Sequence, residues 1–280
     1  MPGYGYSGDR RQAVLARLLI AAIIALAACI GYFTQTAENP VTGETQRVAM
    51  SESEEIALGL HARPVLIQQH GGLHPSAQAR RHVQEVGGRL LAHLERNLAA
   101  KGRRNPYPFE FHLLADPRTI NAFALPGGQV FITSGLYQRL ETEGELAGVL
   151  GHEIGHVLSR HGAQQLAKQR LTQGLAGAAG VAGGDVQSAR LAQAVGQVVA
   201  MKYGRDAELE SDRWGVRLMA WAGYDPRAML GVMRILDEAS GAGGPPEMLS
   251  THPKPANRAA YIQDVLQKEF PSGLPPGLRP

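Results

Sequence analysis

The chain has 280 residues, of which 44% are hydrophobic and 19% are charged. This composition excludes a wholly disordered chain and leaves room for one sizeable domain or two small ones. The net charge is only +3, and arginines near the N-terminus supply most of it, so the composition does not indicate nucleic-acid binding. Cys29 is the single cysteine, which excludes an internal disulfide and a cysteine cage around a metal.

Residues 1–34 predict a membrane anchor. The stretch 18–33 contains no charged residue. With the alanine-rich residues that precede it, the segment is long enough to cross a bilayer, which takes about 20 residues. Arg10, Arg11 and Arg17 precede this stretch, and few charges follow it. That asymmetry favours a cytoplasmic N-terminus and places the rest of the chain on the periplasmic or extracytoplasmic side.

Two other interpretations of this segment stay open. The apolar stretch could be the core of a signal peptide that is cleaved. The sequence Leu-Ala-Ala-Cys ending at Cys29 also resembles a bacterial lipobox, which would leave a lipid on this cysteine. The apolar stretch continues to Phe33, which a spanning helix needs and a lipoprotein does not, so an uncleaved anchor is favoured over a lipid anchor.

The first half of the chain then predicts a linker, helices and strands. Residues 35–50 are polar and rich in turn-forming residues, which is typical of a linker. Ser51 and Glu54 form the Ser-x-x-Glu pattern of a helix N-terminus. Periodicity predicts three further elements: a helix over 76–100, a strand over 109–114, and a strand, a Pro-Gly-Gly turn and a second strand over 120–133.

Helical periodicity dominates the second half. Four helices are predicted there, over 143–160, 205–222, 226–240 and 257–270. Residues 171–200 are rich in Ala, Gly and Gln and predict a loosely packed helical stretch, and residues 271–280 form a Pro-rich tail. The mixture predicts a mainly helical α+β fold with a small antiparallel sheet, and not alternating β-α-β units.

The most informative motif is His-Glu-x-x-His at 152–156, inside a predicted helix. Residues four apart are separated by about 40° around a helix axis, so His152 and His156 lie on one face and can share a metal ion. Glu153 lies about 100° away and can reach a water molecule on the metal without being a ligand. The flanking residues are apolar, which argues against a solvated His/Glu surface.

A catalytic zinc site takes a third protein ligand. The metzincin pattern would need Gly at 159 and His at 162, but Ser159 and Gly162 stand there, so that class is excluded. His161 is expected on the wrong side of the helix, as a surface or supporting residue. A downstream acid remains: Glu208 and Asp212 share one face of the next helix, so one can bind the metal while the other orients a histidine. Glu210 points elsewhere and is expected to be a solvated acid.

Four stretches, taken in order, resemble the membrane-associated gluzincin metallopeptidases of family 48, which include CAAX prenyl proteases and HtpX-like, BepA-like and LoiP-like proteases. They are Asn121 to Gly128 (NAFALPGG), the motif at 152–156, Tyr203 to Asp212, and Ser250 to Pro253 followed by Arg258. The likeness extends from residue 51 to about residue 268. It implies a metallopeptidase domain over 51–270. Gly204 and Ser211 depart from residues common in the family, but neither is at a ligand position.

The resemblance also implies a role for each matching residue. His152, His156 and Glu208 would bind one Zn²⁺ per chain, and Glu153 would be the general base. His252 would approach the metal as a reversible fourth ligand or as a donor to the developing oxyanion. The supporting residues would be Asp212 and Arg258. An edge strand for an extended substrate would be formed by Asn121, Ala122, Phe123 and Ala124.

The expected function is therefore that of a zinc metalloendopeptidase acting on unfolded or misfolded polypeptides in envelope quality control, with no nucleic-acid partner. An alternative is a zinc-binding chaperone or adaptor with silenced protease activity, although the intact Glu153 argues against it. Two further alternatives are a different zinc hydrolase and a purely structural zinc site. The latter would need His252 as a permanent fourth ligand. The sequence leaves the oligomeric state open.

Overall fold

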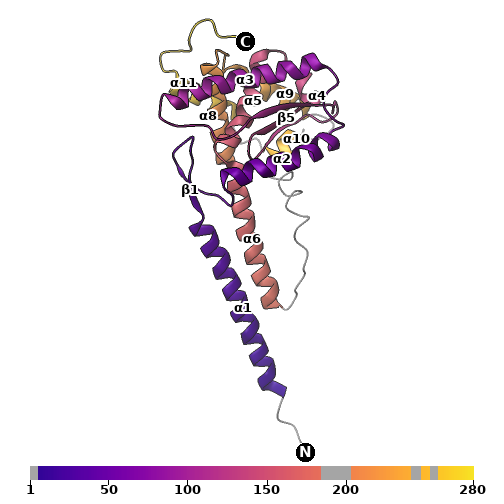
Figure 1. Cartoon of the computed structure of the whole chain (residues 1–280), viewed down its shortest axis with the longest axis vertical. Coiled ribbons are helices and arrows are strands. Elements are labelled where there is room, and N and C mark those ends of the chain that lie inside the picture. The colour runs from indigo at the N-terminus through magenta and orange to yellow at the C-terminus, as the bar shows by residue number, and fades with distance from the viewer. Residues whose placement is uncertain (1–5, 184–202, 241–246, 253–257) are drawn as a thin grey trace, which may run out of the picture. The chain divides into compact units, whose positions relative to one another are not determined.

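The computed structural model describes residues 6–183, 203–240, 247–252 and 258–280. The chain divides into two compact units (Figure 1). Unit 1 comprises residues 1–38, 45–49 and 163–199, and unit 2 comprises residues 39–44, 50–162 and 200–280. The predicted mainly helical α+β fold is confirmed. Of the Ala- and Gly-rich stretch predicted at 171–200, the part beyond residue 183 lies outside the described residues.

Unit 1 is built on two long helices, α1 (Tyr6–Thr34) and most of α6 (His161–Gly183). By length and composition, the part of α1 from Arg11 to Thr34 could cross a membrane. Small residues let the two helices approach closely, because a Cβ added to Gly174 of α6 would lie 2.5 Å from the Cβ of Ala28. The segment expected to be a linker contains an antiparallel pair of short strands, β1 (Thr36–Glu38) and β2 (Thr45–Arg47).

A three-stranded sheet lies in unit 2, in the order β3 (Glu110–Leu114), β5 (Gln129–Thr133), β4 (Ala122–Leu125). β4 and β5 form the predicted hairpin around the Pro-Gly-Gly turn, and Gly127 and Gly128 both have positive φ, which glycine adopts readily. The expectation of a wholly antiparallel sheet is wrong. β5 returns between the other two strands, so β3 pairs with it in parallel.

Helices cover the sheet and build the core of unit 2. They are α2 (Glu52–Gln69), α3 (Ala77–Ala99), α4 (Ser134–Tyr137), α5 (Glu143–Leu158), α8 (Arg205–Trp221), α9 (Ala228–Ala239), α10 (Glu247–Thr251) and α11 (Arg258–Glu269). The predicted capping box of Ser51 and Glu54 is present at the start of α2, and Thr142 and Glu145 form a second one at the start of α5. Each box satisfies backbone N–H groups that a helix N-terminus leaves without partners.

The contact between α5 and α8 positions the site. Every residue of α5 from Gly144 to Leu158 is buried. Glycines let the two backbones meet: a Cβ on Gly151 would lie 3.1 Å from the Cα of Gly215, and a Cβ on Gly155 would lie 3.0 Å from the Cα of Ser211. This close approach brings the acidic face of α8 against the His-Glu-x-x-His face of α5.

The Pro-rich tail over 271–280 packs on unit 2. The N–H of Arg279 donates to the carbonyl of Gly223 at 2.9 Å, and its own carbonyl accepts from the N–H of Asp225 at 2.7 Å. The carbonyl of Pro280 accepts from Gly144 at 2.9 Å, at the first turn of α5. These backbone bonds hold the tail in place without any periodic pattern in its sequence.

Candidate metal centre

The two imidazoles of the motif in α5 face each other. His152 and His156 are each 2% exposed, and their Nε2 atoms lie 3.0 Å apart. Both Nδ1 atoms point outward to other partners: Asp212 Oδ1 at 2.9 Å from His152, and His161 Nδ1 at 3.0 Å from His156. An ionised Asp212 can only accept, so the Nδ1 of His152 donates to it, while its Nε2 faces His156.

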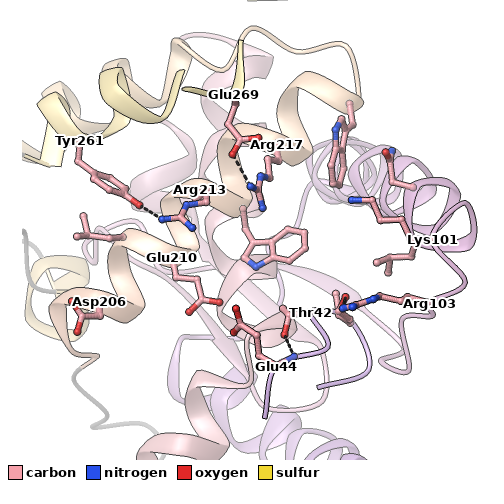
Figure 2. Close-up of a pocket in the computed structure, with 16 residues that line it drawn as sticks. Thr42, Glu44, Lys101, Arg103, Asp206, Glu210, Arg213, Arg217, Tyr261 and Glu269 are labelled. Atoms are coloured by element: carbon pink, nitrogen blue, oxygen red, sulfur yellow. Dashed lines mark hydrogen bonds and ion pairs between the residues drawn. The ribbon is translucent and has the colours of Figure 1, made fainter. Parts of the chain in front are cut away.

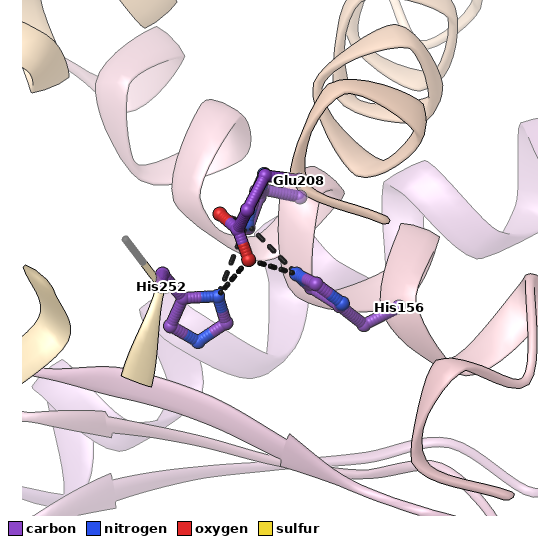
Figure 3. A group of neighbouring side chains, drawn as sticks. His156, Glu208 and His252 are labelled. Carbon is purple, nitrogen blue, oxygen red and sulfur yellow. Dashed lines mark hydrogen bonds and ion pairs between the residues drawn. The ribbon is translucent and has the colours of Figure 1, made fainter. Parts of the chain in front are cut away.

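Glu208 of α8 completes a cluster with these rings, and Figure 3 shows it beside His156 and His252. Its oxygens lie 3.5 Å from Nε2 of His152 and 3.4 Å from Nε2 of His156. His252, which directly follows α10, places its Nδ1 3.1 Å from Glu208 Oε1. Within the described residues, these four side chains offer ligand atoms that all lie within 4.8 Å of one another, and all four are buried.

A second layer of charge lies behind His152. Arg258, at the start of α11, donates from Nε to Asp212 Oδ2 at 2.7 Å and from Nη2 to Asp212 Oδ1 at 2.6 Å. Burial opposes ionisation of Asp212, but the guanidinium and the imidazole beside it lower its pKa below the ordinary value. The carboxylate therefore stays charged and fixes the orientation of the His152 ring. Pro253, part of the motif that follows His252, lies outside the described residues.

The electrostatics of the cluster favour a negative carboxylate among imidazoles. Burial disfavours the charged form of Glu208, but hydrogen bonds from His152, His156 and His252 lower its pKa well below the usual range. Burial lowers the pKa of His156, so that ring is neutral at pH 7. A neutral imidazole and an ionised carboxylate are the forms that bind a metal.

Glu153 distinguishes this cluster from a purely structural ion-pair network. It is 0% exposed, and neither of its carboxylate oxygens has a hydrogen-bond partner among the described residues. The Nε2 atom of His252 lies 3.6 Å from its Oε1. Burial raises the pKa of Glu153. A buried, unsatisfied carboxylate beside two imidazoles and a second carboxylate fits a divalent cation with a reactive water next to it.

Comparison with known proteins places this cluster in a family. The model of peptidase family M48 matches residues 78–266, which is more than half of the chain and includes the whole cluster. The chain belongs to peptidase family M48. The family is one of metal-dependent peptidases, and the predicted resemblance is confirmed.

Several M48 relatives are similar over the same region. The chain is 34% identical over 190 residues to the beta-barrel assembly-enhancing protease of Escherichia coli K12, covering 64% of this chain and 37% of that protein. It is 33% identical over 174 residues to the mitochondrial metalloendopeptidase OMA1 of Schizosaccharomyces pombe, covering 62% and 51%. The OMA1 metalloendopeptidase of Danio rerio is 28% identical over 252 residues, covering 85% and 52%. The chain thus spans about half or less of these relatives' length.

Some residues beside the cluster have positions or contacts that the sequence did not predict. His161 is buried, with 5% exposure, and contacts His156, so the expected orientation and the surface alternative are wrong, whereas the alternative of a supporting residue agrees with this contact. Glu210 is not a free solvated acid, since its oxygens lie 2.6 Å from Ser159 Oγ and 3.3 Å from His161 Nε2. The ring of Tyr203 stacks on His156 with centroids 4.0 Å apart. Tyr203 lies inside a stretch that carries the family resemblance, but neither its residue type nor its spacing predicted that it contacts the cluster.

The predicted substrate strand, β4, is an edge strand that packs against α5. The N–H of Thr133 donates to the carbonyl of Asn121 at 3.0 Å, and bonded pairs alternate along an antiparallel ladder. From the register, the backbone groups of Phe123 therefore bond to β5, whereas those of Ala122 and Ala124 point away from it. Ala124 also lines a small cavity together with His156 and Tyr203, so this part of the strand lies near the cluster.

Proposed function

We propose that this M48 chain is a zinc-dependent metalloendopeptidase that hydrolyses peptide bonds of unfolded or misfolded polypeptides in the envelope. The observation that carries the proposal is the buried carboxylate of Glu153, which has no hydrogen-bond partner in the described residues and lies beside a His-His-Glu ligand set. A structural metal site needs no such group, whereas hydrolysis needs a base within reach of water.

His152, His156 and Glu208 would hold the metal, since two imidazoles and one carboxylate form a set typical of catalytic zinc. Bound zinc supplies Lewis-acid polarisation of a carbonyl and acidifies water. Glu153 takes a proton from the attacking water and later passes it to the leaving amine, and its raised pKa suits both transfers. His252, with a buried Nε2 that has no hydrogen-bond partner in the described residues, is a reversible fourth ligand or a donor to the oxyanion.

The proposed substrate site is the open edge of β4. An extended polypeptide can add as a further strand by bonding to the outward backbone groups of Ala124, whereas Ala122 is fully buried. The buried Oδ1 of Asn121, at the start of this edge, has no hydrogen-bond partner in the described residues and is an acceptor for an added N–H group. Because such pairing reads the backbone, it favours unfolded segments over a particular sequence.

The N-terminal helix α1 supports a membrane location. We propose that it anchors the chain and that unit 2 lies on the periplasmic or extracytoplasmic side, because arginines precede the apolar segment. Relatives named as an assembly-enhancing protease of beta-barrels and as mitochondrial metalloendopeptidases support a role in protein quality control at a membrane.

The test compares Glu153→Gln with the wild-type full chain in detergent, using unfolded casein as substrate. We expect Glu153→Gln to retain its zinc and to lose at least about 100-fold in hydrolysis rate, because a positioned general base contributes about 10²–10⁴-fold. Glu238→Gln, at a 71%-exposed glutamate of α9, is the matched control and should match the wild type. Turnover by zinc-loaded Glu153→Gln at the wild-type rate would refute the proposal.

A further inference from the structure

We infer that His161 and Glu210 form a positioning pair that holds His156 in the orientation and tautomer needed for metal binding. The inference rests on the proposed metal centre and concerns residues outside its ligand set. Among the described contacts of the His156 ring, the Nδ1 atom, which faces away from Glu208, lies 3.0 Å from Nδ1 of His161. The opposite nitrogen of His161, Nε2, lies 3.3 Å from Glu210 Oε2.

The direction of each hydrogen bond follows from Glu210, the acceptor at the end of this series of contacts. Glu210 accepts on Oε1 from the hydroxyl of Ser159, and its ionised carboxylate can only accept on Oε2 as well. His161 therefore donates from Nε2, which leaves a lone pair on its Nδ1. That lone pair accepts the Nδ1 proton of His156. The Nε2 of His156 then carries a lone pair toward the ligand cluster, as metal binding requires.

The local backbone explains why this pair could not be read from helical spacing. Helix α5 ends at Leu158 with Ser159 as its C-cap, and Arg160 is the one non-glycine residue with positive φ in the described chain, at 56°. This left-handed residue breaks the helix and turns His161 back onto His156. The conformation is held in place because the Arg160 guanidinium donates from Nε to Glu55 at 3.1 Å and from Nη2 to the carbonyl of Met50 at 2.7 Å.

Glu210 approaches from the face of α8 opposite to the ligand face. Glu208 and Asp212 face the imidazoles, whereas Glu210 lies about 200° around the helix from Glu208. Its side chain is 34% exposed and lines a cleft of about 850 Å³, together with Asp206 and Arg213 (Figure 2). Burial opposes its ionisation, but hydrogen bonds from His161 and Ser159 lower its pKa, which agrees with a charged acceptor at neutral pH.

Both imidazoles of the His-Glu-x-x-His motif are thus supported from behind by a carboxylate. His152 contacts Asp212 directly, at 2.9 Å, and His156 reaches Glu210 through the ring of His161. Groups of this kind that orient a metal ligand typically change metal affinity by about 10- to 100-fold when they are removed. The pair therefore predicts an effect on metal binding itself, measurable without any substrate.

The decisive variants are His161→Leu and His161→Gln. Leucine removes the acceptor for His156, whereas the amide oxygen of glutamine can replace it. We measure the zinc dissociation constant of the full chain in detergent by competition with a chelating indicator, and folding of each metal-free variant by circular dichroism. The expected result is about 10- to 100-fold weaker zinc binding for His161→Leu and recovery by His161→Gln to within about 3-fold of the wild type.

The role of Glu210 is tested by a double-mutant cycle. Glu210→Gln should weaken zinc binding about 5-fold in the wild-type background, because a charged acceptor is replaced by a neutral one, and should have no effect in the His161→Leu background. Asp206→Asn is the matched control, since this acid lines the same cleft one turn earlier and should leave zinc binding unchanged.

Three results would overturn the inference. They are wild-type affinity in His161→Leu, equal weakening in His161→Leu and His161→Gln, and additive effects of the His161 and Glu210 substitutions. If the wild-type chain itself fails to bind zinc, the proposed metal centre fails instead, so the two failures are distinguishable.

Discussion

Asp212 and Arg258 form a buried ion pair directly behind the proposed metal ligands. Arg258 is 1% exposed and Asp212 is 0% exposed, and two hydrogen bonds join them. Removing one partner of such a pair leaves an uncompensated charge in the protein interior. The pair therefore links the stability of unit 2 to the orientation of the His152 ring.

We predict that Arg258→Ala lowers the free energy of unfolding by about 3–5 kcal/mol, because Asp212 loses its countercharge. Arg213→Ala is the control, because this exposed arginine of α8 donates to the hydroxyl of Tyr261 at the surface. Its loss should lower the free energy of unfolding by at most about 1 kcal/mol. Urea denaturation of the metal-free chains, followed by circular dichroism, measures both. Equal midpoints for the two variants would contradict the predicted role of Arg258.

Spacing predicted the cluster residues that lie on regular helices. The separation of four between His152 and His156, and between Glu208 and Asp212, fixes a shared face whatever the rest of the fold does. His161 was misplaced because the same rule was extended past the helix end. The left-handed conformation of Arg160 depends on tertiary contacts with Glu55 and the backbone of Met50, and these are separated by more than 100 residues from it.

At the scale of elements, strand β4 combines structural and proposed substrate-binding roles. Its inward backbone groups complete the ladder with β5, and its outward groups bond to no other strand of the described sheet. Proline has no N–H group and is tolerated on an edge strand only where that group faces outward. Proline substitutions at two neighbouring positions of β4, Phe123 and Ala124, can therefore test the two roles separately.

We predict that Ala124→Pro retains the fold and zinc content but raises KM for unfolded casein by about 10-fold, as expected for one lost backbone hydrogen bond of about 1–1.5 kcal/mol. Phe123→Pro, which removes an N–H group of the ladder, should instead destabilise unit 2. Unchanged KM in a folded Ala124→Pro variant would exclude strand addition at this edge.

The loop before β4 is held by Asp116. Its Oδ1 accepts from the N–H groups of Arg118 and Thr119, and its Oδ2 accepts from the Thr119 hydroxyl at 2.7 Å and lies 3.0 Å from His70 Nδ1. Burial raises the pKa of Asp116, but the hydrogen bonds, led by those from Thr119 and His70, outweigh it and hold the pKa at about 2, against 3.8 for a free aspartate. The native state therefore favours the ionised carboxylate.

We predict that Asp116→Asn lowers the free energy of unfolding by about 1 kcal/mol at pH 7. The stabilisation by Asp116 is fully present above the unfolded pKa of 3.8 and is lost as the pH falls through about 2. The difference between variant and wild type should therefore shrink between pH 4 and pH 2, as followed by urea denaturation at several pH values. A difference that stays constant over this range would contradict the assignment.

The elements themselves were largely predictable because their signals are local. Ser51, Ser76 and Thr142 cap the helices that begin after them, and apolar periodicity extends through α3. The direction of β3 was not predictable in this way. Strand order depends on which strand lies between the others, and alternation along 109–114 is the same for parallel and antiparallel pairing.

At the scale of the whole molecule, α1 is the element proposed to anchor the chain at a membrane. The apolar segment from Arg11 to Thr34 is long enough to cross a bilayer, but Cys29 also follows a lipobox-like sequence. An uncleaved spanning helix keeps its N-terminal residues and needs no lipid. A lipoprotein begins at the modified cysteine.

We predict that Cys29→Ser leaves the apparent mass and the membrane fraction unchanged after an alkaline carbonate wash, because a spanning helix is held by its apolar length alone. Metabolic labelling with a radioactive fatty acid gives the independent readout, and no label should depend on Cys29. Labelling of the wild type that disappears in Cys29→Ser would show a lipid anchor instead.

The proposed metal centre depends most on Glu208, the carboxylate that the chain brings from α8 to the imidazoles of α5. Elemental analysis of the purified full chain tests it directly, with Glu238→Ala as the exposed control. We predict about one zinc per chain in the wild type and in the control, and almost none in folded Glu208→Ala. Undiminished zinc content in Glu208→Ala would contradict the proposed metal centre.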